Sequence, residues 1–177
     1  MTVDERDAAK DDRVRAFIAA ARLEAHTLYD GVATPHRSCG IALAETFGRR
    51  TAPYQALRRG GLTGCGECGA IVAGRLLIGE FFGDPDPTGA VTPALMDAMQ
   101  AFEAKWRARI SRGAAAGDSI VCNVLTGQFP VFKSPERHRF CTDLATEVAT
   151  CVAEVLAERD VFAREEPPVA PVPRGAS

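Results

Sequence analysis

The sequence predicts an all-α fold, a single bundle-like domain of six or seven helices around a central helix rich in small residues. Apolar residues recur every three or four positions along several segments, which is the spacing of one helix face. No two segments show the alternating pattern typical of paired strands. The chain has 177 residues, 46% apolar and 25% charged, so it is long enough to form one ordinary globular core.

The first two helical segments have clear boundaries. Apolar residues at helical spacing run through 5–29, and Gly31 follows as a stop signal. A short second helix, 39–47, begins after Ser38, a good N-cap residue, and ends before Gly48. A helix N-terminus therefore falls at the first cysteine of the chain.

The later segments show the same signals. Proline stands at the first position of 53–59, 93–112 and 135–160, where its missing N–H group is tolerated. Segment 119–127 is short and begins at a serine that can cap it. We predict that residues 1–162 form the domain and that the proline-rich tail, 163–177, is disordered.

The predicted central helix, 66–82, is apolar on nearly all sides and contains several glycines. A glycine inside a helix costs about 1 kcal/mol relative to alanine. We therefore expect a neighbouring backbone or a bulky group to approach closely at Gly69, Gly74 and Gly79. The pattern leaves open whether that neighbour belongs to the same chain or to a second copy in a homo-oligomer.

Charge and hydropathy limit the classes of function. The net charge is −2 and the isoelectric point is near 5.9, which gives no basic footprint for nucleic acid. The sequence contains no run of about 18 uncharged apolar residues, so we expect no membrane span. The N-terminus is acidic and lacks the apolar core of a signal peptide. We expect a soluble, cytoplasmic protein that binds neither nucleic acid nor membrane.

Six cysteines are the clearest chemical feature, and in a reducing cytosol such a set favours metal binding or redox activity over disulfides. They are Cys39, Cys65, Cys68, Cys122, Cys141 and Cys151. The pair in C-x-x-C order lies at the start of the central helix, where a helix N-terminus is expected to lower the pKa of a thiol. Cys39, Cys122 and Cys141 lie on or beside apolar faces, so they can converge on that helix start.

Cys151 is expected to be a core residue. It lies ten residues beyond Cys141, or about 15 Å along one helix axis, too far for both to bind one compact centre. His36 and His138 each precede a cysteine by three residues. A mixed site with histidine favours zinc, and an all-thiolate site suits iron–sulfur or zinc. A histidine at either position is more often a surface or supporting residue than a metal ligand.

The order of segments resembles the C_GCAxxG_C_C family of redox-active proteins. Cys39 in SCGIALAETFG, Cys68 in GECGAIVAGRLLIG, Cys122 in SIVCNVL and Cys141 in FCTDLATEVATCVAEVL match its cysteines in order, over about 35–156. The chain departs from the pattern in having Glu and Gly around the second of these, in the extra Cys65, and in longer insertions near 84–92 and 113–118. The resemblance implies an all-helical fold and a redox role.

Three functions follow as hypotheses. The resemblance implies that Cys39, Cys68, Cys122 and Cys141 hold an iron–sulfur cluster, of the [4Fe–4S] type, in an electron-transfer protein, with Cys65 as an alternative ligand. Metal-free thiol–disulfide exchange would use Cys65 to attack and Cys68 to resolve. Structural zinc in a helical interaction protein is the third.

The remaining motifs exclude other chemistry and suggest a partner. The sequence contains no G-x-S-x-G, H-E-x-x-H or phosphate-binding loop motif, and no C-x-x-C-H for covalent haem. The basic stretch 49–59 carries Arg49, Arg50, Arg58 and Arg59. It is typical of a solvated helix face, and it could also dock an acidic protein redox partner.

Overall fold

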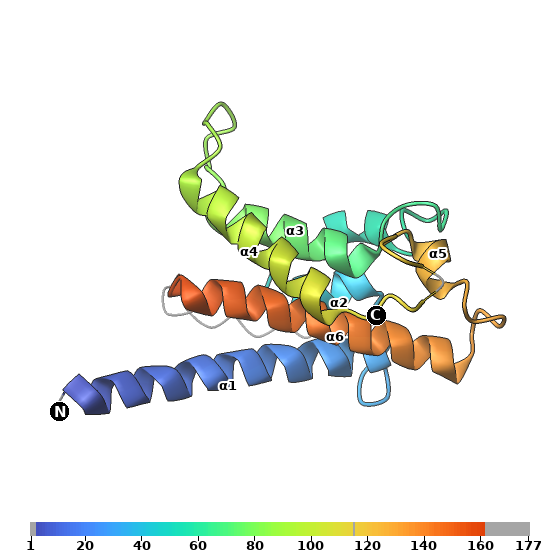
Figure 1. Ribbon diagram of the computed structural model, residues 1–177, viewed down its shortest axis with the longest axis horizontal. Coiled ribbons are helices and arrows are strands. Elements are labelled where there is room, and N and C mark those ends of the chain that lie inside the picture. The colour runs from blue at the N-terminus through green and yellow to red at the C-terminus, as the bar shows by residue number, and fades with distance from the viewer. Residues whose placement is uncertain (1–2, 115, 162–177) are drawn as a thin grey trace, which may run out of the picture.

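The structure is a computed structural model that describes residues 3–114 and 116–161. Within these residues it contains six α-helices and one short 3-10 helix, η1, and no strand, which confirms the predicted all-α fold (Figure 1). The elements are α1 (Val3–Asp30), α2 (Cys39–Thr46), η1 (Pro53–Leu57), α3 (Gly69–Phe82), α4 (Pro93–Arg109), α5 (Cys122–Thr126) and α6 (Pro135–Glu158). The predicted tail lies outside the described residues.

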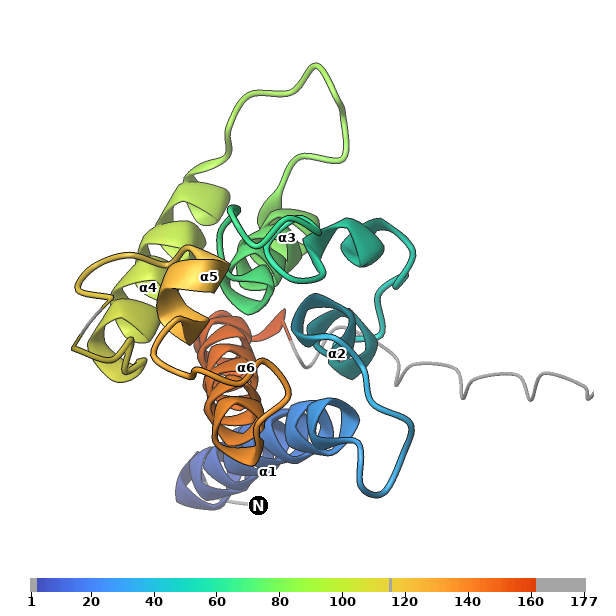
Figure 2. The ribbon, with the colours of Figure 1, turned by 90° about the vertical axis from the view of Figure 1, so that its right-hand side faces the viewer.

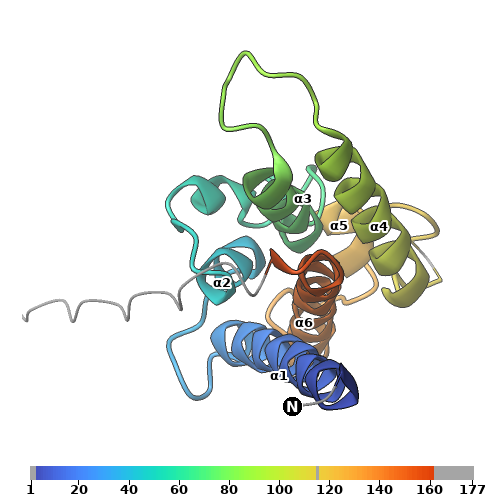
Figure 3. The same cartoon turned by 90° about the vertical axis from the view of Figure 1, so that its left-hand side faces the viewer.

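Helix α6 runs through the middle of the bundle, because it packs against α1, α2, α3 and α4 (Figure 3). It begins where the sequence predicts: the Ser134 hydroxyl accepts a hydrogen bond from Arg137 N–H, and Pro135 is the first helical residue. Its apolar face is buried from Leu144 to Ala157. No helix in the described part of the chain is long and apolar enough to cross a membrane.

The glycines of α3 confirm the expected close approaches at two positions of three. A Cβ atom added at Gly69 would lie less than 3.0 Å from the carbonyl oxygen of Leu57, and one added at Gly74 would meet the ring of Phe102. At Gly79 the space is open, so the expectation is wrong there. Both close neighbours belong to the same chain, and α3 packs against η1, α2, α4 and α6.

The predicted start of α3 is wrong by three residues, and the reason concerns the site. Residues 64–68 run alongside 120–123 instead of winding into a helix. Cys68 N–H donates to Ile120 O at 2.7 Å, Cys122 N–H donates to Gly66 O at 2.9 Å, and an isolated bridge joins Glu67 to Val121. These long-range bonds satisfy amides that the first helical turn would leave unpaired. They also hold two cysteines side by side.

Candidate functional site

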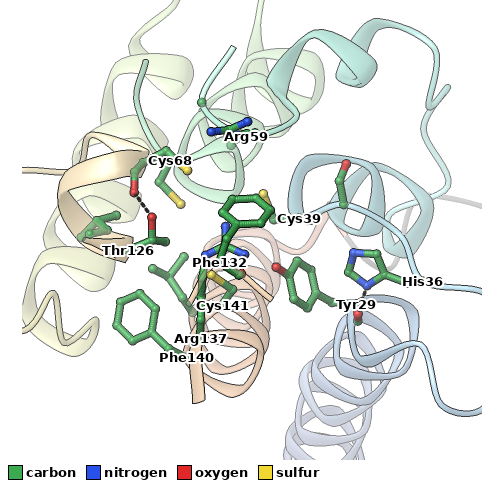
Figure 4. A pocket seen from close by; sticks show the side chains of 16 residues that line it. Tyr29, His36, Cys39, Arg59, Cys68, Thr126, Phe132, Arg137, Phe140 and Cys141 are labelled. Carbon is green, nitrogen blue, oxygen red and sulfur yellow. Dashed lines mark hydrogen bonds between the residues drawn. The ribbon is translucent and has the colours of Figure 1, made fainter. Parts of the chain in front are cut away.

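Four cysteines from four separate segments line one cavity of about 210 Å³ at the end of the bundle (Figure 4). We call Cys39, Cys68, Cys122 and Cys141 the cavity cysteines. They come from the start of α2, the N-cap of α3, the start of α5 and the second turn of α6. The four cysteines that the sequence resemblance singles out are therefore the ones that the fold brings together.

Local backbone structure fixes each position. The bonds between 64–68 and 120–123 fix Cys68 relative to Cys122. A Cβ atom at Gly69 would be 3.1 Å from the Cys39 sulfur, so only glycine lets α3 approach the start of α2 this closely. Gly60, with φ of +56°, has the same role beside Cys122, since an added Cβ would lie 2.7 Å from the Cys122 Cβ.

The cavity cysteines lie close enough to influence one another's charge. For every pair of the four, the charge on one thiolate would raise the pKa of another. Burial is the largest cause of the raised pKa of each thiol, and it raises that of Cys68 to about 12. All four are consequently protonated near neutral pH when nothing is bound.

The expected low pKa of Cys68 is wrong. The backbone N–H groups of Ala70 and Ile71 do lower its pKa, as a helix N-terminus should. Burial outweighs them, because the sulfur loses the water that would stabilise its negative charge. The sequence shows the helix start but not the depth at which it is buried.

Two arginines and a phenylalanine form the outer wall. The guanidinium of Arg59 lies 4.9 Å from the centre of the Phe132 ring, and that of Arg137 lies 3.9 Å from it. Figure 4 shows Phe132 between them, in front of the Cys39 and Cys141 side chains. Arg59 and Arg137 both lower the pKa of Cys122, against the larger opposing effect of burial. The wall therefore brings positive charge to the thiols.

Tyr29 is a lining residue that the sequence analysis did not single out. Its side chain is buried. Burial is the largest effect on the Cys141 thiol and raises its pKa, whereas the Arg137 charge and hydrogen bonding from the Tyr29 hydroxyl both lower it. In the sequence Tyr29 only ends an amphipathic helix, and no local motif marks it. The contact arises because α1 ends beside α6.

The histidines support Tyr29 rather than joining the thiols. His36 Nδ1 donates to the backbone carbonyl of Tyr29, and His138 Nε2 lies 3.0 Å from that of Asp30. The His36 ring meets the Tyr29 ring edge to face, with the ring centroids 4.8 Å apart, and the His138 ring stacks on it at 5.6 Å. His36 also lines the cavity. These contacts favour the supporting interpretation of both histidines over ligation.

Two polar atoms at the cavity wall have no hydrogen-bond partner within the described residues. They are the buried Ser38 Oγ and Arg137 Nε. A buried donor without a partner is costly, so such atoms point to a group that the protein alone does not provide. Both belong to residues that line the cavity.

The other two cysteines lie elsewhere. Cys65 is exposed and is not among the residues that line the cavity. Cys151 is fully buried in the hydrophobic core, as its spacing predicts. Among the described residues, no three His, Cys, Asp or Glu side chains meet as the ligands of one metal ion would.

Comparison of the chain with protein-family models, with curated proteins and with solved structures finds no match.

Proposed function

We propose that the cavity cysteines bind an iron–sulfur cluster and that the protein is a redox-active, electron-transfer protein. The observation that carries the proposal is the cavity itself, lined by four thiols from segments that are far apart in the sequence. Four cysteine thiolates are the usual ligands of a [4Fe–4S] cluster. When bound, the cluster would supply one-electron chemistry.

The donor arrangement favours a cluster over a single zinc ion. Zinc takes four ligands at about 2.0–2.3 Å, so its ligands must meet at one point. A cluster binds its thiolates at separate iron corners and fills the space between them. The cavity offers about 210 Å³ of such space beside the four thiols.

The residues that line the cavity suit a cluster held by four negatively charged thiolates. Arg59 and Arg137 would offset the negative charge of four thiolates. Ser38 Oγ, Arg137 Nε and the Tyr29 hydroxyl are available to donate hydrogen bonds to sulfur, and such bonds tune the potential of a cluster. The apolar side chains of Leu125, Phe140 and Leu144 keep water from the interior.

Anaerobic purification and reconstitution with iron and sulfide test the proposal. We expect brown protein with broad visible absorption that bleaches with dithionite, and a loss of iron when any cavity cysteine is changed to serine. Cys65→Ser is the matched control and is expected to keep its iron, because Cys65 does not line the cavity. Iron-free, colourless protein after reconstitution would overturn the proposal, and one zinc per chain would favour structural zinc.

A further inference from the structure

Exposed apolar side chains gather at the end of the molecule that carries the cavity. Leu62, Val131 and Phe132 are 66%, 60% and 49% exposed. Phe132 lines the cavity, Val131 is the residue before Phe132, and Leu62 lies two residues after Gly60, another lining residue. Figure 2 faces this end, where the loop before α6 lies beside the start of that helix and the loop before α3 lies near α5. Scattered exposed apolar residues need no explanation, but a group around one opening does.

The same end carries positive charge that no carboxylate pairs with within the described residues. Arg58, Arg59, Lys133 and Arg137 form no ion pair within the described part of the chain, whereas Glu67 nearby is paired with Arg75. The whole chain has a net charge of −2, so this end is locally basic on an acidic protein. Arginine and aromatic side chains are also the types most enriched at the energetic centres of protein interfaces.

We propose that Leu62, Val131 and Phe132, with the rim of Arg58, Arg59 and Lys133, form the docking surface for a protein redox partner that carries an acidic rim. The proposal rests on the proposed function, since it places the partner over the wall closest to the thiols. A protein partner fits better than an anionic lipid surface or nucleic acid, because a localised acidic rim attracts the basic end without repelling the acidic remainder.

A binding titration of the reconstituted protein with an acidic [2Fe–2S] ferredoxin as probe tests the proposal, with a basic c-type cytochrome as the opposite-charge probe. The test variant is Arg58→Glu/Lys133→Glu, which changes two exposed rim residues that do not line the cavity. The matched control is Arg6→Glu/Arg13→Glu, the same charge change on exposed residues of α1, far from the cavity end (Figure 1). Iron content and the visible spectrum are measured on every sample.

We expect the ferredoxin to bind at about 0.01 M ionic strength, where charges act over about 30 Å, and to bind at least tenfold more weakly in about 0.15 M salt. The test variant should lose about tenfold in affinity and the control less than about twofold. No binding at low salt, equal losses in both variants, or tighter binding of the cytochrome would overturn the proposal. Binding to phosphatidylserine vesicles instead of ferredoxin, or a dimer dissolved by the test variant, would also overturn it.

The two proposals fail separately. A protein that gains no iron but binds the ferredoxin through this surface contradicts only the proposed function. A brown protein with a normal spectrum that fails the titration contradicts only the docking surface.

Discussion

Gly69→Ala tests the packing that brings α3 to the cavity. The new Cβ would lie less than 3.0 Å from the Leu57 carbonyl oxygen and 3.1 Å from the Cys39 sulfur. The first neighbour is backbone and cannot rotate away, so α3 and η1 must separate by several tenths of an ångström. Overpacking of this kind typically costs about 1–3 kcal/mol.

Gly79→Ala is the matched control in the same helix. A Cβ there meets nothing within 4 Å, so the change adds only helix propensity. Replacing a helical glycine by alanine stabilises by about 0.5–1 kcal/mol. The two substitutions add the same methyl group and are expected to change the free energy of unfolding in opposite directions.

Urea denaturation of the metal-free protein, followed by circular dichroism, measures both changes. We expect Gly69→Ala to lower the free energy of unfolding and Gly79→Ala to raise it, with the slope m unchanged. Iron incorporation should fall for Gly69→Ala alone, because its methyl group also presses on Cys39. If Gly69→Ala were as stable as the control, the close approach of α3 to η1 would be refuted.

Two further predictions concern thiol access and pH. In the metal-free protein, iodoacetamide should label Cys65 first because its side chain is exposed. It should label Cys151 last, because burial encloses that thiol and raises its pKa to about 12. Peptide mass spectrometry measures the order of labelling, and equal rates would contradict the structure. Burial acts to raise the pKa of Glu154, but hydrogen bonds from Arg109 and Lys105 dominate and lower it. The ionised Glu154 carboxylate therefore stabilises the folded protein above about pH 4.5, which is its pKa in the unfolded chain. This stabilisation is lost as the pH falls through the lower pKa of the folded state. Glu154→Gln should reduce the melting temperature at pH 7 and approach the wild type in acid, whereas Glu24→Gln, an exposed change on α1, should change neither; an equal deficit at all pH values would contradict the linkage.

The sequence predicts the helices well because their boundary signals are local. Ser134 and Pro135 start α6, and Thr92 caps α4 by accepting a hydrogen bond from Leu95 N–H. Each signal acts within about one turn of helix, so it can be recognised without knowledge of the fold. The segment 64–68 fails for the opposite reason, since its hydrogen-bond partners lie more than fifty residues away in the sequence.

For the site too, the features set by local signals could be predicted, and those set by long-range contacts could not. That several cysteines converge is predicted from the helix starts and apolar faces on which they lie. Which cysteine of the C-x-x-C faces inward is not, because that depends on the pairing of 64–68 with 120–123, which buries Cys68 and leaves Cys65 exposed. Tyr29 reaches Cys141 only through the packing of α1 on α6, a contact between residues more than a hundred positions apart.

The different surroundings of Cys65 and Cys68 bear on the choice between metal-free exchange and a bound cluster. A resolving thiol must reach its partner and carry a useful fraction of thiolate, and burial raises the pKa of Cys68 to about 12. The three thiols that influence its charge are Cys39, Cys122 and Cys141, on the cavity side. A buried thiol that shares a cavity with three other thiols and two polar atoms without a hydrogen-bond partner is poorly suited to attack by surface disulfides. It is well suited to hold a bound cation, because a positively charged centre stabilises the thiolates that burial disfavours.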